Sequence, residues 1–552
     1  MRLPRSAKLA SLPVAYALLR WFAQPPIALG WLVFLVPLPL LLWSDQPDHR
    51  TRRLGGYGWV YLAGFGYWLI SLQGLRHANP LLYPAWIALS AYLAVYGVAF
   101  LIAHRRLKIW KVPTILAAPV AWVGCEWLRN YVLSGLSVCM LGHSLAEHPM
   151  LIQIADTLGT YGVSFVIAMI AAGIYEAMRL LRTREDIVTG MLSVGAAVVV
   201  LAACLVYGWH RLGQPTPPGD LNLLLVGLDE QTEYEQDQDR EREIFTAYTR
   251  KTIEVITSMD KQSTDKIDVV VWPESMYSGA MPWMVTADDL NVPPEAGMDA
   301  REFRDNIEQW RAAYKQRAAD MSRLIGGETH MIAGGGVIVY GERIKPYSGL
   351  VHVTPDGQID WYGKTHLVLF GETIPILSTW SIFESIVPPG LGLARGKTAK
   401  AFGIDDTRLA ANICIETAVE RVAVNHFRQF LHNGEGLPDA IITVTNDAWF
   451  DHSSVVEHHL RCGQLVAVAC RRPLLSAGNG GPTAWIDSCG RVVKRVPPGQ
   501  AGHLLARPNL DPRIPAYLSL SDWPAAVMGL VAFASFASSL YSKRKKRSRE
   551  AA

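Results

Sequence analysis

Residues 268–275 read DVVVWPES and give the clearest indication of the fold. Within them, residues 268–272 form a run of strand length, in which four apolar residues follow Asp268. Such a run is the pattern of a strand buried on both faces of a sheet. Pro273 ends the run, and the carboxylate of Glu274 follows at once. The segment therefore predicts a buried strand with an acidic side chain at its end.

Strands and helices alternate around this segment. Further apolar runs of strand length lie at residues 221–226, 331–340, 409–415 and 440–444. Helical patterns lie between them at about 240–258, 303–325, 417–431 and 454–470, and the turn at 355–357 predicts a hairpin over 349–362. The alternation predicts a layered α/β domain over residues 211–515, a length that can bury a core of its own.

Two more short segments place a reactive side chain beside a strand. They are YGKTH at 362–366, which contains Lys364, and NICIE at 412–416, which contains Cys414. A carboxylate can take the proton of a thiol, and a nearby ammonium group lowers the thiol pKa and can donate to a developing oxyanion. Glu274, Lys364 and Cys414 together therefore predict a thiol nucleophile with its own base and its own cation.

The composition indicates that another part of the chain lies in a membrane. Of the 552 residues, 50% are hydrophobic and 18% are charged, whereas an ordinary soluble domain carries about 25% charge. We expect a polytopic bundle of about eight transmembrane helices, because apolar stretches near the required length of about 20 residues recur. They lie at about 9–23, 25–43, 57–74, 81–103, 113–134, 161–178, 188–209 and 517–541.

These stretches divide the chain into three expected parts. Residues 1–210 form a membrane domain with seven transmembrane helices, residues 211–515 form the α/β domain, and residues 516–552 form the eighth helix and a basic tail. An entirely soluble protein is excluded, and so is a pure membrane bundle. The net charge of −9 over residues 211–515 argues against a nucleic-acid partner, which would require a clustered basic face.

The positions of the basic residues predict the orientation of the bundle. Lysines and arginines gather at the N-terminus, in every second loop and in the C-terminal tail, whereas residues 135–160 contain none. Because short cytoplasmic loops carry the basic residues, we expect both termini in the cytoplasm and the α/β domain outside it. Buried helices of a soluble protein would not produce this alternation. A signal peptide at the N-terminus is disfavoured by the second apolar run directly behind the first.

Two charged residues lie inside the fifth apolar stretch. Glu126 and Arg129 are three positions apart and therefore share one helical face. Charged side chains within a membrane are costly, and they usually form an internal pair or serve a function. We expect a structural ion pair near the outer end of this span, with a functional role as the alternative.

The motifs resemble those of a known superfamily. WPES, GKTHLVLFGE, NICIE and TNDAWF follow one another at residues 272–275, 363–372, 412–416 and 445–450. This order resembles the nitrilase superfamily, whose Glu, Lys and Cys triad lies on a four-layer αββα sandwich. A nitrilase-like domain between the seventh and eighth of eight spans resembles the apolipoprotein N-acyltransferase family of the bacterial envelope. The resemblance extends from about residue 10 to residue 540.

The resemblance implies a role for each matching residue. Glu274 matches the general base, Lys364 the oxyanion-stabilising lysine and Cys414 the nucleophile, while Glu372 and Glu416 match supporting carboxylates. Two departures concern the surroundings of the triad. The family usually has a tyrosine directly after the nucleophile, and this chain has Ile415 there. The family's QGN-like start, with a tryptophan shortly behind it, is replaced by GLD at residues 227–229 and by Tyr234.

The resemblance also implies an activity and a location. An acyl chain would pass from a membrane phospholipid, through a Cys414 thioester, to the α-amino group of an apolipoprotein whose N-terminal cysteine bears a diacylglyceryl group. Such a protein would lie in the bacterial inner membrane, in contact with lipid and with its catalytic domain on the periplasmic side. No cofactor is expected. A membrane-anchored amidase with the same triad and a non-catalytic lipid-binding scaffold are the alternatives.

Other residues are candidates for the surroundings of the site. An apolar loop at 276–284 and residues 380–386 are expected to form a lid that admits acyl chains, with Trp283 and Met284 at the membrane boundary. Asn446, Asp447 and Trp449 are expected to border the pocket. No metal site is expected, because the adjacent His458 and His459 would point about 100° apart on a helix. A disulfide among Cys462, Cys470 and Cys489 stays open.

Overall fold

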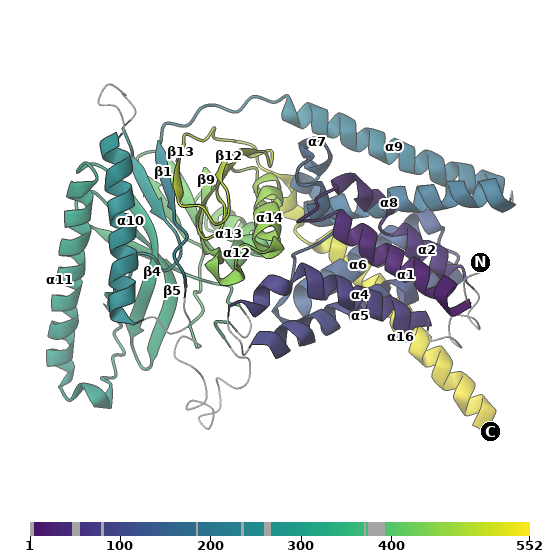
Figure 1. Cartoon of the computed structure of the whole chain (residues 1–552), viewed down its shortest axis with the longest axis horizontal. Helices are drawn as coiled ribbons and strands as arrows, with labels where there is room; N and C mark the ends of the chain where they lie inside the picture. The colour runs from purple at the N-terminus through teal and green to yellow at the C-terminus, as the bar shows by residue number, and fades with distance from the viewer. Residues whose placement is uncertain are drawn as a thin grey trace.

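Two parts of the chain are distinct in the computed structural model, which describes residues 5–46, 56–78, 82–183, 186–232, 237–258, 266–368, 371–373 and 392–551. An α/β domain lies at one end of the molecule and a bundle of helices at the other (Figure 1). The chain leaves the bundle after α9 (Ile187–Leu212) and returns to it through α16 (Trp523–Ala551). The α/β domain is therefore inserted between helices of the bundle.

The bundle is made of helical segments. Three helices among the described residues are long and apolar enough to cross a membrane, namely Leu82–Ile109, Ala155–Arg182 and Ile187–Leu212, and Gly30–Ser44 and Trp523–Ser538 are shorter apolar helices. The helices are α1 (Arg5–Phe22), α2 (Leu38–Ser44), α4 (Gly56–Ser71), α5 (Leu82–Ile109), α6 (Thr114–Tyr131), α7 (Pro149–Ile152), α8 (Ala155–Thr183), α9 and α16, with short 3₁₀ turns η1 (Gly30–Leu35), η2 (Gln73–Arg76), η3 (Val132–Ser134) and η4 (Gly142–Leu145).

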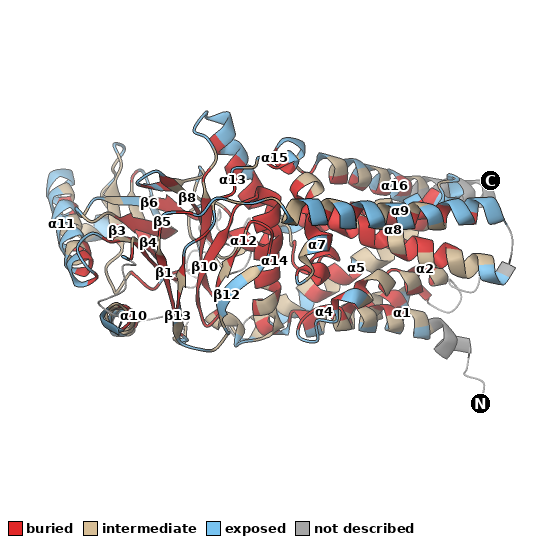
Figure 2. Cartoon of the chain, turned by 90° about the horizontal axis from the view of Figure 1, so that it is seen from above, coloured by how far each residue is buried: buried red, intermediate tan, exposed pale blue. Residues whose placement is uncertain are grey.

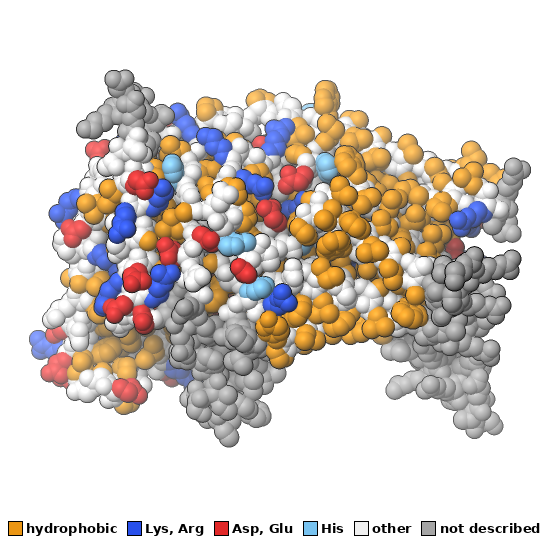
Figure 3. All heavy atoms as spheres, viewed as in Figure 1, with side chains coloured by type: hydrophobic (Ala, Val, Ile, Leu, Met, Phe, Trp, Pro, Cys, Tyr) orange, Lys and Arg blue, Asp and Glu red, His pale blue; other side chains and the backbone are white. Residues whose placement is uncertain are grey.

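The surface of the bundle is apolar. Hydrophobic side chains cover most of its visible face, whereas Lys, Arg, Asp and Glu gather over the α/β domain (Figure 3). Helix α9, for example, has several exposed apolar side chains, namely Val188, Met191, Leu192, Val206 and Trp209. Exposed apolar surface of this extent is typical of contact with lipid rather than with water.

The α/β domain contains two sheets packed face to face. One has the strand order β13-β1-β2-β4-β5-β6, with β3 paired to β4, and the other has the order β12-β11-β10-β9-β8-β7. The strands are β1 (Leu223–Gly227), β2 (Val269–Trp272), β3 (Trp283–Thr286), β4 (His330–Tyr340), β5 (Ile344–Val353), β6 (Ile359–Gly363), β7 (Ala401–Ile404), β8 (Thr407–Ile413), β9 (Ala440–Asn446), β10 (Leu474–Asn479), β11 (Thr483–Ile486), β12 (Val492–Val496) and β13 (Gly502–Ala506).

Buried aliphatic residues from both sheets form the core between them. Leu225 and Val271 come from the first sheet, and Ile413, Ile442 and Ala477 come from the second. The predicted hairpin at 349–362 is confirmed, since β5 and β6 pair in antiparallel fashion from Gly349 and Gly363 to Val353 and Ile359. The predicted run at 268–272 is confirmed as β2, whose four residues are all buried.

Helices cover the outer face of each sheet and complete an αββα sandwich. Helices α10 (Gln238–Ser258) and α11 (Ala300–Leu324) form the outer layer, with the 3₁₀ turn η5 (Pro294–Ala296) before α11. The layer that faces the bundle consists of α12 (Ile415–Ala418), α13 (Glu420–His432) and α14 (Ser454–Cys470), with η8 (Asp447–Phe450) before α14 and α15 (Ala516–Leu520) after the last strand. Figure 2 shows much of α11 exposed and α14 almost wholly buried.

Polar side chains connect the inner layer to the bundle. Arg471, the residue after α14, forms a salt bridge with Asp156 of α8 at 2.7 Å, and neither side chain is exposed. Arg211, at the end of α9, contacts the same Asp156 oxygen at 2.7 Å. In α13, Glu420 accepts hydrogen bonds from the N–H (3.0 Å) and the hydroxyl group of Thr160. The α/β domain is therefore docked on the bundle through buried charges.

The predicted lid at 276–284 is wrong for Trp283. Residues 283–286 form β3, which pairs in parallel with β4, and the Trp283 side chain is 3% exposed. Its ring packs on Tyr314 of α11, with centroids 5.1 Å apart, while Met284 is half-buried. In Figure 2, β3 lies beside α11 at the end of the domain far from the bundle. The sandwich itself therefore covers the Trp283 side chain. The other predicted part of the lid, residues 380–386, lies outside the described residues.

Candidate active site

The three predicted reactive side chains lie at the ends of three strands. Glu274 follows β2 by one proline, Lys364 follows β6 directly, and Cys414 follows β8 directly. The strands β2 and β6 belong to one sheet and β8 belongs to the other. Packing the two sheets face to face therefore brings Cys414 toward the carboxylate and the lysine.

Lys364 joins two carboxylates. Its Nζ lies 3.0 Å from Oε1 of Glu274 and 2.6 Å from Oε1 of Glu372, and the side chain is 1% exposed. Ser348 of β5 donates its hydroxyl to the same Glu274 oxygen at 3.1 Å, and the Val368 N–H donates to Oε2 of Glu372 at 2.8 Å. Burial lowers the pKa of Lys364, but attraction to the two carboxylates outweighs it and holds the pKa well above its usual range. Lys364 is therefore a fixed cation.

Cys414 has an unusual backbone conformation. Its φ of 48° and ψ of −110° are unfavourable for a residue with a Cβ atom, and such strain tends to occur at functional sites. Hydrogen bonds hold the turn, because the Cys414 N–H donates to the carbonyl oxygen of Val444 (2.9 Å) and the Thr417 N–H donates to that of Cys414 (3.0 Å). The partly buried thiol is thereby held at the end of β8.

The charges around Cys414 set the state of its thiol. Burial raises the pKa of the Cys414 thiol well above its usual range, the Glu274 carboxylate raises it further, and the Lys364 ammonium group opposes this rise. The resting thiol is therefore protonated. If Glu274 accepts the thiol proton, its negative charge disappears, and the remaining charge of Lys364 stabilises the thiolate. The arrangement suits a base that acts when a substrate arrives.

Glu416 fixes the lysine segment to the cysteine turn. Its Oε1 accepts from the Tyr362 hydroxyl (2.7 Å), from the N–H and the hydroxyl of Thr365 (both 2.6 Å) and from the His366 N–H (3.1 Å). Its Oε2 accepts from the N–H of Ile413 (2.8 Å). Glu416 thus positions Lys364 and Cys414 relative to each other.

His459 is a member of the site that sequence reasoning missed. Its Nδ1 lies 3.1 Å from Oδ1 of Asp447, and its Nε2 lies 3.0 Å from the carbonyl oxygen of Cys414. Both partners accept hydrogen bonds, so the two contacts together require a proton on each ring nitrogen. Burial lowers the pKa of His459, but the Asp447 carboxylate outweighs it and the pKa is raised. A charged His459 therefore holds the nucleophile turn, a role that its position beside His458 in the sequence does not reveal.

The remaining candidates border the site in different ways. The Oδ1 of Asn446 accepts from the Thr232 hydroxyl and from the Asn479 amide, both at 3.0 Å, which ties together three loops at strand ends. Trp449 lies partly buried in η8.

All seven cysteines are unpaired, and Cys462 and Cys470 lie in the core on one helix. Among the described residues, no group of three or more His, Cys, Asp or Glu is placed to hold a metal ion.

Two parts of the chain match families of known proteins. Residues 238–511 match the carbon-nitrogen hydrolase family, which defines the class of the α/β domain. Residues 16–173 match the apolipoprotein N-acyltransferase N-terminal domain. An apolipoprotein N-acyltransferase of Rhodopirellula baltica is 44% identical over 97% of this chain and 98% of its own length. The chain therefore belongs to the apolipoprotein N-acyltransferase family.

More distant relatives have the same description. An apolipoprotein N-acyltransferase of Geobacter metallireducens is 27% identical over 86% of this chain and 84% of its own length. Among solved structures, a CN-hydrolase superfamily protein of Xanthomonas campestris is 18% identical, with a TM-score of 0.32, over 56% of this chain and 96% of its own.

Proposed function

We propose that the protein is an N-acyltransferase that moves an acyl chain from a membrane phospholipid to the N-terminus of a lipoprotein. Glu274 takes the thiol proton of Cys414, and the thiolate attacks the carbonyl carbon of a phospholipid ester. Lys364 and a backbone N–H beyond the cysteine stabilise the tetrahedral oxyanion. The intermediate collapses to a Cys414 thioester, and the alkoxide leaves as a lysophospholipid with the proton from Glu274.

The second half of the reaction uses the same groups. The α-amino group of a diacylglyceryl-cysteine attacks the thioester, Glu274 accepts a proton from that amine, and the Cys414 thiolate leaves and is reprotonated. An α-amine has a pKa near 8, so a neutral fraction exists at physiological pH without help. Because the first product leaves before the acceptor reacts, ping-pong kinetics are expected.

One observation carries the choice of a lipid substrate, namely the apolar contact directly beside the nucleophile. Ile415 packs against a cluster whose buried members include Trp68 of α4, Leu72 directly after α4, Leu93 of α5 and Val138. The side of the cysteine turn that faces the bundle is thus lined by residues of membrane helices. An acyl ester can approach Cys414 along such a surface from the bilayer, whereas a small polar amide gains nothing from it.

The topology follows as part of the same proposal. The chain crosses the bacterial inner membrane eight times, with both termini in the cytoplasm and the α/β domain on the periplasmic side. The parts are residues 1–210, 211–515 and 516–552. A cysteine introduced at Glu295, near α11, is expected to react with a membrane-impermeant thiol reagent in intact spheroplasts, and one at Arg182 only after lysis. Labelling of both before lysis would contradict this orientation.

The chemistry is tested by trapping the acyl-enzyme. Purified protein is incubated with a phospholipid carrying a radiolabelled acyl chain, and the label is expected on Cys414 and to be released by neutral hydroxylamine. Cys414→Ala is expected to carry none, while Cys470→Ala, a core cysteine, is the matched control and retains it. Absence of label from the wild-type protein would overturn the proposal.

A second step separates transfer from hydrolysis. The labelled enzyme is mixed with a synthetic peptide whose N-terminal cysteine bears a diacylglyceryl group, and the label is expected on the peptide amine. Release of free fatty acid with no labelled peptide would indicate a membrane-anchored hydrolase of the amidase kind. Recovery of the label in an amide bond, resistant to hydroxylamine, identifies the acyltransferase.

A further inference from the structure

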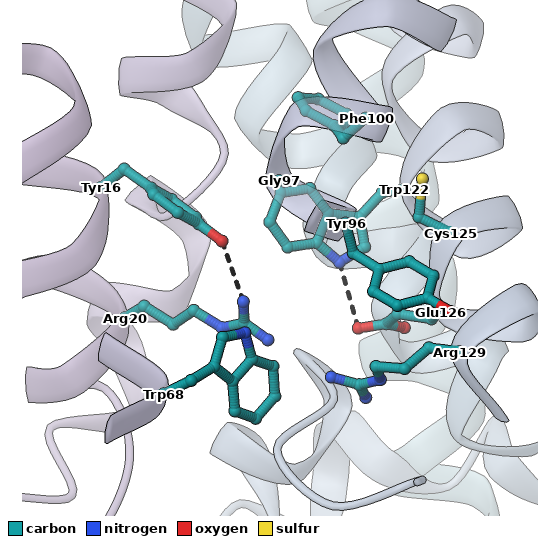
Figure 4. Close-up of a pocket in the computed structure, with 10 residues that line it drawn as sticks. All are labelled: Tyr16, Arg20, Trp68, Tyr96, Gly97, Phe100, Trp122, Cys125, Glu126 and Arg129. Carbon is teal, nitrogen blue, oxygen red and sulfur yellow. Dashed lines mark hydrogen bonds between the residues drawn. The ribbon is translucent and has the colours of Figure 1, made fainter. Parts of the chain in front are cut away.

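A pocket inside the helical bundle contains a second group of buried charges, separate from the Cys414 site. It lies between α1, α4, α5 and α6 and has an empty volume of about 330 Å³, which includes the open solvent at its mouth. Arg20 enters from α1, and Glu126 and Arg129 enter from α6 (Figure 4). All three side chains are at least nine-tenths buried.

The predicted ion pair between Glu126 and Arg129 is wrong. Oε1 of Glu126 instead accepts from the indole N–H of Trp122 (3.1 Å) and from the backbone N–H of Leu141 (2.9 Å), and no salt bridge joins these two described residues. Glu126 and Arg129 both line the pocket from α6, and Arg129 extends across the pocket toward Arg20 (Figure 4).

The two guanidinium groups share one aromatic neighbour. The Arg20 guanidinium carbon lies 4.8 Å from the ring centroid of Trp68, and that of Arg129 lies 5.3 Å from it. A cation over an indole ring gains only about 1–2 kcal/mol, which does not compensate two desolvated charges of like sign. With one carboxylate against two guanidinium groups, the lining has a net charge of +1.

Several hydrogen-bonding groups in the pocket have no partner. They are the Nε of Arg20, the Nε and one Nη of Arg129, and the second oxygen of Glu126. Arg20 does use its other nitrogens, on the Tyr16 hydroxyl (2.9 Å) and the Cys139 carbonyl oxygen (3.0 Å). Buried guanidinium N–H groups without acceptors are costly. They therefore point to an acceptor that comes from outside the chain.

The position of the pocket limits what that acceptor can be. Arg20 and Trp68 lie in the last turns of α1 and α4, and Arg129 lies in the last turn of α6. The next segment of the chain touches the α/β domain, because Arg421 donates to the carbonyl oxygens of Asn130 (3.2 Å) and Ser134 (2.8 Å). The pocket thus lies within the bundle, just beneath the docked domain. The ends of the three helices offset part of the positive charge but supply no acceptor to the unpaired N–H groups.

We propose that Arg20 and Arg129 form a binding site for the phosphate group of a membrane phospholipid, within the bundle and separate from the catalytic cysteine. A phosphodiester carries one negative charge, which balances the net charge of the lining, and its oxygens match the hydrogen-bonding pattern of guanidinium groups. The apolar surface of the bundle would receive the acyl chains.

The site is tested by lipid binding, with no need for catalysis. Full-length protein, purified and delipidated in neutral detergent, is titrated with dioctanoyl phosphatidylglycerol, and bound lipids are counted by native mass spectrometry. Arg129→Gln and Arg20→Gln are each expected to lower the affinity for one bound phospholipid at least tenfold. Arg129→Lys, which keeps the charge, is expected to lower it by less. Arg105→Gln is the matched control, because Arg105 also lies over an aromatic ring of the bundle, that of Trp43, but outside the pocket. Phospholipid binding by Arg105→Gln is expected to be unchanged.

The direction in which Glu126→Gln changes the affinity for phospholipid distinguishes a ligand site from a structural cluster. Glu126→Gln removes the only negative charge of the lining while keeping an acceptor for Trp122, and it is expected to tighten phospholipid binding several-fold. Equal binding by Glu126→Gln and wild type, or by Arg129→Gln and wild type, would overturn the proposal. Competition by inorganic phosphate or octanoate at the same concentration would also overturn it, since the ligand would then be a free anion. Dioctanoylglycerol, which lacks the phosphate, is expected not to compete.

Discussion

The two helix layers of the α/β sandwich have the same place in the fold but different surroundings. In the outer layer, Arg242 and Asp239 of α10 form an ion pair with both side chains exposed to water. In the inner layer, Arg471 at the end of α14 has no exposed surface and contacts an equally buried Asp156. Figure 2 shows the same contrast between α11, much of which is exposed, and α14, which is almost wholly buried. The sandwich is therefore a soluble domain on one side and half of a buried interface on the other.

The largest expected effect is at Asp156. Asp156→Asn leaves the Arg471 guanidinium group buried without its carboxylate and also removes the partner of Arg211. Loss of one member of a buried ion pair typically costs about 3–5 kcal/mol. The apparent free energy of unfolding in detergent, followed by circular dichroism, is expected to fall by that amount. A change no larger than that of an exposed pair in α10 would show that the two layers are equivalent.

A pH dependence is expected at Glu420, also in the inner layer. Burial raises the pKa of Glu420 to about 7, although donation from Thr160 lowers it, and the nearby Asp522 carboxylate raises it. The folded protein thus keeps a proton that the unfolded chain releases above about pH 4.5. Stability contributed by this group is therefore present at low pH and is lost as the pH rises to 7, by an amount on the order of 3 kcal/mol.

Comparison with a neutral side chain isolates this group. Glu420→Gln cannot titrate, so the difference in unfolding midpoint between the variant and the wild type is expected to change between pH 4.5 and 7 and to stay constant above it. Other titrating groups affect both proteins and cancel in the difference. A difference that is independent of pH would contradict the raised pKa of Glu420.

A smaller effect is expected in the outer layer, at the start of α11. Asp299 accepts from the N–H groups of Arg301 and Glu302, and Glu302 accepts from the N–H of Asp299, which completes a capping box. Asp299→Ala is expected to cost about 1 kcal/mol, measured as the change in apparent free energy of unfolding. A cost as large as that of Asp156→Asn would remove the distinction between the layers.

The smallest effect is expected at Asp239. Its carboxylate lies 2.8 Å from Arg242, but the side chains are 86% and 60% exposed, and such pairs contribute about 0–1 kcal/mol. Asp239→Asn makes the same chemical change as Asp156→Asn and is its matched control. Added salt is expected to abolish what little effect it has, whereas the Asp156 effect is expected to persist.

Local patterns explain what could be predicted from the sequence. The run at 331–340 is β4 (His330–Tyr340), and the helical pattern at 454–470 is α14, because each element has a periodicity contained in its own residues. The reactive positions Glu274, Lys364 and Cys414 stand out because each directly follows such an element.

Partners far apart in the chain explain what could not be predicted. Residues 283–286 are too few to show a strand pattern, and they are a strand only because β4 offers an edge more than 50 residues later. The Arg471–Asp156 pair joins residues 315 positions apart. The five donors to Glu416 come from Ile413 beside it and from residues 362–366. The sequence suggested a supporting role for Glu416, but its physical basis appears only in three dimensions.

The pairing of β1 with β13 has a mechanical consequence. These antiparallel neighbours are the first and last strands of the α/β domain, and the chain beside them is joined again where the Gly219 N–H donates to the Pro508 carbonyl oxygen. Both covalent connections to the bundle therefore leave the α/β domain at one place. Elsewhere, side chains such as Asp156, Arg471 and Glu420 hold the domain on the bundle.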